Sequence, residues 1–338
     1  MRYRLLGNTG LRVSELFLGA MTFGEQGGVG APLDECRRML DLYADAGGNV
    51  VDTAINYRAG ASEEFLGELL SGRRDQFVLA TKYTVSRDGG DPNAAGNHRK
   101  NLVLSLETSL RRLRTHYIDL YWVHLWDRHT PVEETMRALD DAVRAGKILY
   151  VGISDTPAWV VARANVLAEW RGWTPFAGLQ VPYSLLNRDA ERELLPMAEV
   201  TGMTVAAWSP LAGGILSGKY TRREAADSAR LATATLTDRD HAAARAVQEV
   251  ADELGATPSQ VALAWVRARS RAVHPIVGAR SVGQLTDNLG ALAVDLPDEA
   301  VRRLSATTEI ELGFPADFIG QTSGWVFGDA GNRVDGRR

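Results

Sequence analysis

The chain alternates between short apolar strands and helical stretches along most of its length, and this alternation limits the folds open to it. From residue 15 onward, eight runs predict strands, and each is followed by at least one helical stretch. The expected strands are 15–20, 49–52, 77–82, 118–124, 148–154, 176–181, 204–208 and 273–277. Strands that alternate with helices are typical of a parallel sheet, because each helix returns the chain to the same edge.

Eight such units in 338 residues, with no Pro/Ser-rich linker between halves, favour a closed (β/α)8 TIM barrel and a single domain over residues 1–338. An N-terminal β-hairpin is expected at residues 3–13, where we predict that it covers the bottom of the barrel. Additional C-terminal helices are expected near 282–292 and 298–307, before an aromatic tail. The alternative is a doubly wound open sheet, but no G-x-G-x-x-G follows the first strand.

Composition narrows the class of protein. The apolar fraction of 45% and the net charge of −4 are typical of a globular protein whose main partner is neither nucleic acid nor an anionic membrane. The single cysteine, Cys36, excludes an internal disulfide and fits a reducing compartment. Because no export signal and no run of about 18 apolar residues is present, we expect a cytoplasmic protein without a membrane span.

Ionisable side chains end three successive expected strands. Asp52 ends the second strand, Lys82 the third and His124 the fourth, and Tyr57 follows on the loop after Asp52. The carboxyl ends of parallel strands meet at one rim of a barrel, where active sites of such folds lie. Each residue alone has a commoner structural role as a cap, a solvated charge or a packed ring. Three in succession favour a catalytic group.

This combination of residues suits acid-assisted attack on a carbonyl. A free tyrosine is a poor acid near neutrality because its pKa is about 10, but an adjacent ammonium group lowers the pKa of a phenol. A carboxylate beside the lysine keeps the lysine charged, and an imidazole can orient the carbonyl oxygen. No G-x-S-x-G, H-E-x-x-H or cysteine cluster supports serine or metal chemistry, and we expect no metal. A nicotinamide is a natural hydride source for this reaction.

The segments D-T-A-I-N-Y, A-T-K and V-H, in this order and spacing, resemble the catalytic tetrad of the aldo-keto reductase superfamily. The resemblance extends over essentially the whole chain. It implies a (β/α)8 barrel that reduces aldehydes or ketones with NADPH. It also implies that Tyr57 is the general acid, that Lys82 and Asp52 tune it, and that His124 positions the substrate.

The resemblance also implies a set of cofactor-binding residues in four groups. The first group is the first-strand segment near the cofactor, and the others would contact the nicotinamide carboxamide, the pyrophosphate and the adenosine. In that order the groups are Gly19 and Met21; Ser154, Asp155 and Gln180; Trp208, Ser209, Leu211, Gly213 and Lys219; Gly278, Arg280, Gln284 and Asn288. Many relatives carry Asn where this chain has Asp155, and a carboxylate accepts hydrogen bonds but does not donate them. Arg280 can pair with the 2′-phosphate of NADPH, whereas NADH offers only a hydroxyl there.

One segment nearly matches a P-loop, G-x-x-x-x-G-K-[ST]. Residues 213–220 read G-G-I-L-S-G-K-Y, so Tyr220 replaces the hydroxyl residue that would hold magnesium. Its place after a late strand also argues against a nucleotide triphosphatase.

The substrate is a small-molecule carbonyl compound, and the sequence leaves its identity open. Phe23 and Trp126 are our candidates for an apolar substrate pocket. The glycine-rich loop 24–30 and the insertion 222–235 are consistent with a bulky substrate such as a keto-sugar or natural-product ketone. The alternative function is a redox-sensing regulatory or binding subunit, because potassium-channel β-subunits resemble the same superfamily. Assembly into a homo-oligomer stays open.

Overall fold

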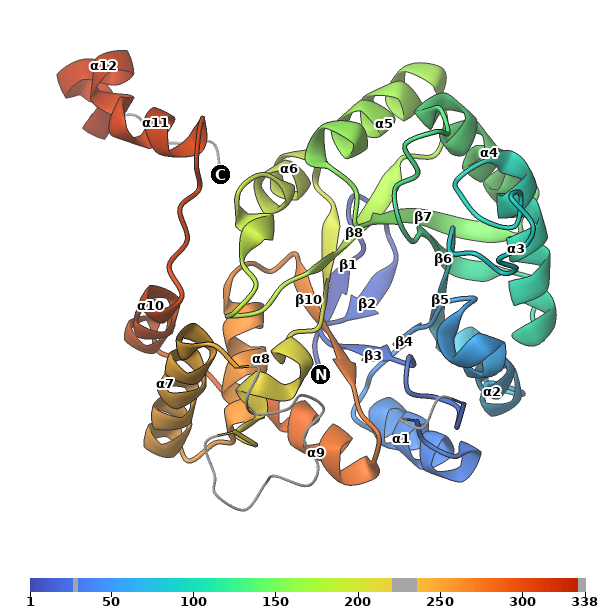
Figure 1. The fold of residues 1–338 in the computed structure, drawn as a ribbon, viewed down its shortest axis with the longest axis horizontal. Helices are drawn as coiled ribbons and strands as arrows, with labels where there is room; N and C mark the ends of the chain where they lie inside the picture. Colours follow the sequence, from blue (N-terminus) through green and yellow to red (C-terminus); the bar gives the residue numbers. More distant parts are fainter. Residues whose placement is uncertain (27–29, 221–235, 334–338) are drawn as a thin grey trace.

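Eight parallel strands close into a barrel in the computed structural model, which describes residues 1–26, 30–220 and 236–333 (Figure 1). Around the barrel the order is β10-β3-β4-β5-β6-β7-β8-β9, so pairing of the last strand with the first one closes the ring. The strands are β3 (Phe17–Gly19), β4 (Val50–Asp52), β5 (Val78–Tyr83), β6 (Ile118–Val123), β7 (Ile148–Ser154), β8 (Phe176–Pro182), β9 (Thr204–Trp208) and β10 (Val273–Gly278). The predicted (β/α)8 barrel is confirmed.

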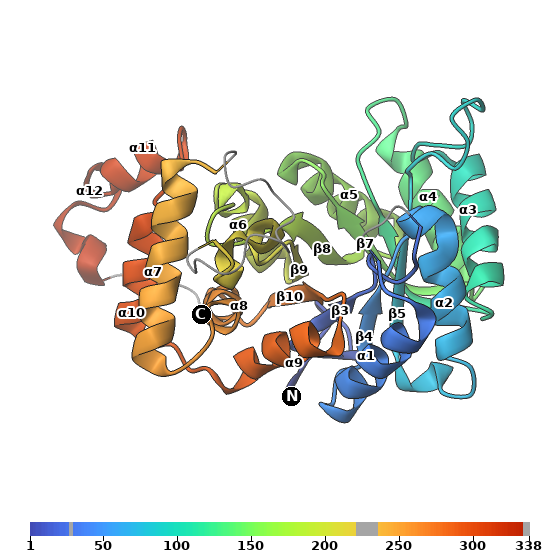
Figure 2. The same cartoon turned by 60° about the horizontal axis from the view of Figure 1, so that its bottom comes forward.

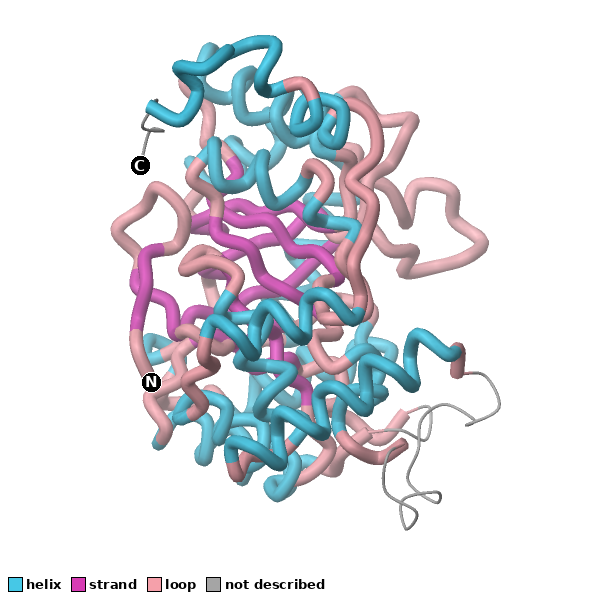
Figure 3. The backbone as a smooth tube through the Cα atoms, turned by 90° about the vertical axis from the view of Figure 1, so that its left-hand side faces the viewer, coloured by secondary structure: helices cyan, strands magenta, loops and turns pink. Residues whose placement is uncertain are grey.

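Helices surround this barrel, and Figure 3 shows the strands between layers of helix. In chain order they are α1 (Leu33–Asp45), α2 (Ala61–Leu69), α3 (Arg99–Arg112), α4 (Val132–Arg144), α5 (Ala158–Arg171), α6 (Leu194–Thr201), α7 (Asp238–Leu254), α8 (Pro258–Ala268), α9 (Val282–Gly290), α10 (Asp298–Thr307), α11 (Ala316–Gln321) and α12 (Ser323–Phe327). None of the helices within the described ranges is long and apolar enough to cross a membrane. The expected insertion 222–235 lies outside the described residues, as does part of loop 24–30.

The N-terminal hairpin closes the bottom of the barrel, as the sequence predicted. Strands β1 (Tyr3–Leu5) and β2 (Arg12–Ser14) pair antiparallel. Leu6 and Val13 are fully buried in a cluster with Phe17, Val50 and Val78, which stand at the starts of β3, β4 and β5. The apolar side chains of the hairpin therefore fill the amino-terminal mouth of the barrel.

Trp122 of β6 occupies the middle of the barrel interior. Its indole is fully buried, and two glycines on the neighbouring strands make room for it. A Cβ atom added at Gly152 would lie 2.3 Å from Trp122 Cε3, and one added at Gly178 would lie 2.9 Å from Cη2. Side chains alternate between the two faces of a strand, so the inward positions above this layer on β4 and β5 are those of Asp52 and Lys82. The polar end of the barrel therefore rests on a packed apolar floor.

Candidate active site

Lys82 is the centre of a hydrogen-bonded group at the carboxyl ends of the strands. It is fully buried, and its Nζ donates to Asp52 Oδ2 at 2.5 Å and to Thr53 O at 2.7 Å. A third bond joins Lys82 Nζ to Tyr57 Oη at 3.3 Å. The other carboxylate oxygen of Asp52 accepts from Gln180 Nε2 at 3.1 Å. The structure thus brings together three members of the predicted tetrad.

Electrostatics keep this lysine charged. Burial by itself disfavours an ammonium ion, but the attraction of Asp52 and Tyr57 and their hydrogen bonds outweigh burial and raise the pKa of Lys82 above its usual value. Lys82 therefore stays protonated through the neutral range, with its charge next to the Tyr57 hydroxyl.

His124 follows β6 and faces Tyr57. The two rings lie edge to face, with centroids 6.0 Å apart and planes at 82°. Burial, together with the positive charge of Lys82, lowers the pKa of His124 to about 3. Its ring is therefore neutral at physiological pH, and the buried Nδ1 has no hydrogen-bond partner among the described residues.

Two arginines that the sequence analysis did not select hold the loop that carries Tyr57. Arg58 Nε donates to Met21 O at 3.1 Å, and its Nη1 donates to Gln26 O at 3.0 Å. On the other side, Arg112 Nη1 donates to Ile55 O at 2.8 Å. Arg58 has a left-handed backbone (φ 52°), which costs free energy in a non-glycine residue and persists only where neighbours hold it. Nothing local in the sequence marks these two arginines, because the bonds that hold the loop go to backbone carbonyls far away in the chain.

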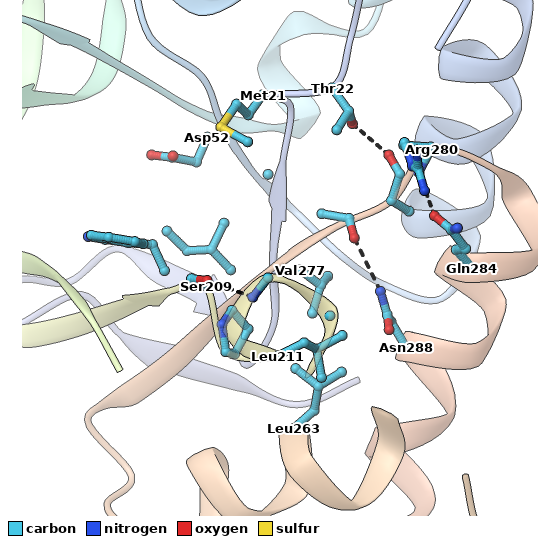
Figure 4. A pocket seen from close by; sticks show the side chains of 18 of the residues that line it. Met21, Thr22, Asp52, Ser209, Leu211, Leu263, Val277, Arg280, Gln284 and Asn288 are labelled. Carbon is cyan, nitrogen blue, oxygen red and sulfur yellow. Dashed lines mark hydrogen bonds between the residues drawn. The ribbon is translucent and has the colours of Figure 1, made fainter. Parts of the chain in front are cut away.

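A cavity of about 690 Å³ extends from this group across the rim to β10 and α9 (Figure 4). Asp52, Tyr57 and His124 line one end, and Lys82 lies behind them. Every residue that the family resemblance assigned to the cofactor lines the same cavity: Gly19, Met21, Ser154, Asp155, Gln180, Trp208, Ser209, Leu211, Gly213, Lys219, Gly278, Arg280, Gln284 and Asn288. The near-P-loop residues Gly214, Ser217 and Tyr220 also line it.

The walls of the cavity carry polar groups that suit a dinucleotide. Ser154 Oγ is buried without a hydrogen-bond partner among the described residues. Farther along, Gln284 Oε1 accepts from Arg280 N at 2.9 Å, and Asn288 Nδ2 donates to Gly278 O at 3.4 Å. Figure 4 shows Arg280, Gln284 and Asn288 on the strand β10 and helix α9 side of the cavity. The cavity therefore offers hydrogen-bonding groups at both of its ends.

The carboxylate of Asp155 has a hydrogen-bond partner in the cavity wall. Trp208 Nε1 donates to Asp155 Oδ1 at 3.2 Å. Burial raises the pKa of Asp155, and the hydrogen bond from Trp208 partly offsets this effect. The Asp155 side chain lines the cavity, and one of its two carboxylate oxygens already accepts a hydrogen bond from the Trp208 indole.

The two predicted substrate residues lie elsewhere. Phe23 is fully buried in the main core, and it does not line the large cavity. The prediction for Phe23 is corrected: its loop turns the ring inward, and a strand-end position alone does not reveal this. Trp126 lines a second cavity of about 320 Å³, between the β6–β7 wall and helices α4 and α5, where its ring meets Trp159 edge to face at 5.9 Å.

Several cavity residues were missed by the sequence analysis. They are mostly small or apolar residues without a motif of their own: Thr22, Asn56, Val85, Ser259, Leu263, Ile276, Val277 and Asp287. Asn56 is the one with a usable signal, because it directly precedes Tyr57. No group of three metal-ligating side chains occurs in the part of the chain that the structure describes.

Together, the fold and the site define a barrel enzyme whose catalytic end holds a buried lysine–carboxylate pair, a tyrosine and a neutral histidine beside a dinucleotide-sized cavity. The chain belongs to the aldo/keto reductase family, whose model matches residues 15–309. A norsolorinic acid reductase of Emericella nidulans is 40% identical, over 92% of this chain and 82% of its own. An aryl-alcohol dehydrogenase [NADP(+)] of Phanerodontia chrysosporium is 37% identical, over 95% of this chain and 90% of its own.

A putative aryl-alcohol dehydrogenase of Saccharomyces cerevisiae is 36% identical, over 94% of this chain and 90% of its own. The family and the names of these relatives support an oxidoreductase that acts on small carbonyl compounds or the corresponding alcohols.

Proposed function

We propose that this protein reduces an aldehyde or ketone to an alcohol with NADPH, with Tyr57 as the general acid. The observation that carries the proposal is the position of Lys82 Nζ, within hydrogen-bond distance of both Asp52 and Tyr57 Oη, at the end of a long cavity. Bound NADPH would supply the hydride that adds to the carbonyl carbon.

Tyr57 would donate its hydroxyl proton to the developing alkoxide oxygen. The phenolate that remains would be stabilised by Lys82, whose charge Asp52 maintains. His124 is neutral, so its ring has one N–H group that can donate to the same oxygen without repelling Lys82. Gln180 holds the second oxygen of Asp52, which fixes the carboxylate towards the lysine.

For the cofactor, we propose that Ser154, Asp155 and Gln180 contact the nicotinamide and that Arg280 contacts the 2′-phosphate. The guanidinium of Arg280 lines the far end of the cavity and has no ion pair within the described ranges. One relative carries NADP(+) in its name, which supports the same choice. We expect Arg280→Ala to raise the dissociation constant of NADPH by ~10-fold or more and that of NADH little.

Fluorescence titration of both cofactors measures this difference. Arg302→Ala, an exposed arginine on α10, is the matched control and should change neither constant. Equal losses for NADPH and NADH would contradict a role for Arg280 at the 2′-phosphate.

We propose aromatic carbonyl compounds as the substrate class. The names of the relatives include aryl-alcohol dehydrogenases and norsolorinic acid reductases, and the indole of Trp208 lies at the cavity beside Asp155. A panel of aryl aldehydes, bulky natural-product ketones and keto-sugars, followed by NADPH absorbance, would rank these classes. Higher kcat/KM for a keto-sugar than for any aryl compound would contradict the aromatic assignment.

The central test is Tyr57→Phe, which removes only the hydroxyl oxygen. Turnover should fall by about 10²–10⁴-fold while NADPH binding is retained. Tyr117→Phe is the matched control, because Tyr117 lies away from the cavity with its hydroxyl on Asp75. Retained turnover in Tyr57→Phe would reject the mechanism.

The alternative function, a redox-sensing subunit like the potassium-channel β-subunits, is separated by rate. Steady NADPH consumption with a small aryl aldehyde is the enzyme outcome. Tight NADPH binding with barely measurable turnover across the whole panel would favour the regulatory role instead.

A further inference from the structure

The end of the chain leaves the barrel after Glu311. Arg188 Nη1 donates to Ser305 O at 2.8 Å, and Arg192 Nε donates to Glu311 O at 3.1 Å. Beyond this point, residues 312–330, here called the C-terminal arm, contain α11 and α12 and project outside the ring of helices. Figures 1 and 2 show the arm beyond α10 and α7 from two directions. The chain is therefore tied to the barrel at Glu311, and the hydrogen bonds that residues 312–330 make among the described residues lie within that segment.

The C-terminal arm carries an unusual density of exposed apolar side chains. Phe314 is 84% exposed and Trp325 is 82% exposed, although Phe318 contacts both rings at centroid distances of 6.0 and 6.3 Å. Other large apolar residues of the arm are also exposed: Leu312, Ile319, Val326 and Phe327. Contiguous exposed apolar surface of this kind marks an interaction site, because a short segment does not hold it in water without cover.

Helix α5 presents a second apolar surface to solvent. Trp159, Val166 and Trp170 follow one another at intervals of seven and four residues, so they share one face of the helix, and each is more than half exposed. The opposite face of α5 is buried against the barrel. Val200, on the neighbouring helix α6, is 88% exposed. The second cavity, lined by Trp159 and Trp126, opens at one end of this α5 face.

Charge favours contact between these two surfaces. The C-terminal arm contains two acidic residues, Asp317 and Asp329, and no lysine or arginine. Helix α5 carries the exposed Arg163 and Arg171; Arg163 pairs with Glu133, and the Arg171 guanidinium lies 4.6 Å from the ring centre of Trp170. An aromatic arm with two carboxylates and a tryptophan-rich helix face beside Arg171 are complementary chiefly in apolarity, with Arg171 as the matching charge.

We propose that a second copy of this chain covers these surfaces: the C-terminal arm of each copy docks on the α5 face of the other. At roughly 150–250 Å² per aromatic side chain, the four aromatic residues of one arm leave on the order of 500 Å² of ring surface in water. In the dimer, the total surface area buried on two arms and on the two surfaces that they cover would be roughly 2,000 Å², which reaches the size of a stable interface. The exchange is reciprocal, so it closes as a symmetric dimer.

The test is the oligomeric state of the full chain at micromolar concentration, measured by light scattering after size exclusion. Wild type is expected to be a dimer. An arm variant, Phe318→Asp with Trp325→Asp, and a face variant, Trp170→Asp, should each raise the dimer dissociation constant by ~30-fold or more. Val103→Asp, on the exposed surface of α3, is the matched control and should stay dimeric.

Mixing identifies the docking partner of the arm. An arm variant has an intact α5 face, and a face variant has an intact arm, so an equimolar mixture should recover heterodimer through one of the two contacts. An unchanged thermal midpoint in both variants shows that the barrel is folded. A monomeric wild type overturns the proposal. The proposal is also overturned if an arm variant remains dimeric or if the mixture forms no heterodimer.

Discussion

The bottom and the upper rim of the barrel each hold a histidine, and the two histidines differ in what surrounds them. At the bottom, His274 of β10 packs against the ring of Phe17 at 5.0 Å, and its Nδ1 bonds to Ser14 O at 2.9 Å. At the rim, His124 faces Tyr57 and an open cavity. Burial lowers the pKa of both, to about 4 for His274 and about 3 for His124.

A shifted pKa therefore does not separate the structural histidine from the candidate catalytic one. The difference lies in the space next to each ring, because the hairpin fills the bottom of the barrel, whereas a cavity stays open at the rim among the residues that the structure describes. The comparison predicts that changes at the rim act mainly on turnover and that changes at the bottom act mainly on stability.

The largest effect is expected for Lys82→Met at the rim. The variant removes the cation next to Tyr57, so turnover should fall by a factor on the order of 10⁴. It also leaves Asp52 buried without its partner, which should lower the free energy of unfolding by about 3–5 kcal/mol. Steady-state kinetics and denaturant unfolding measure the two effects. Lys147→Met, which breaks an exposed pair with Glu107, is the control for losing a lysine.

Trp122→Ala tests the packed floor between the two ends. Removal of this buried indole should cost about 3–5 kcal/mol of unfolding free energy, because Gly152 and Gly178 have no side chains to collapse into the space. Gly178→Ala should cost about 1–3 kcal/mol by overpacking the same ring. The change in unfolding free energy is measured from the shift of the denaturant midpoint, provided that the dependence of this free energy on denaturant concentration is unchanged. A cost below about 1 kcal/mol for Trp122→Ala would show that the floor is not packed as described.

The two histidines themselves provide the direct contrast. His124→Gln should lower turnover by a factor on the order of 10², with little change in unfolding free energy, because Nδ1 has no protein partner among the described residues. His274→Gln should leave turnover unchanged and lower the free energy of unfolding by about 1–3 kcal/mol through loss of the bond to Ser14 and of ring packing. The reverse pattern would refute the comparison between the two ends.

The smallest effect is a pH dependence of stability. Because the native pKa of His274, about 4, lies below the unfolded value of about 6.5, the unfolded state binds the proton first as pH falls. The stability associated with the neutral ring is complete above about pH 6.5 and is lost as pH falls through about 4. Unfolding free energies measured between these limits should decrease with acidity, and His274→Gln should make the decrease shallower. A parallel decrease in both proteins would assign the effect to other groups.

Much of the architecture followed from patterns within short stretches of the chain. Short apolar runs that alternate with helical stretches located the eight strands, and successive strand ends placed Asp52, Lys82 and His124 at one rim. Phe23 shows the limit of this approach, because its loop conformation turned a predicted pocket residue into a core residue. Trp126 shows a second limit, since its ring lines a different cavity from the one that holds Tyr57.

By itself, the sequence determined the strand–helix alternation, the closed barrel and the identity of the residues at the strand ends, because these depend on local periodicity and on the fixed direction of parallel strands. The tertiary structure alone decided that Arg58 and Arg112 hold the Tyr57 loop and that two glycines admit Trp122. It also decided that the arm leaves the barrel at Glu311. These features depend on contacts between segments far apart in the chain, and such contacts leave no periodic signal in the sequence.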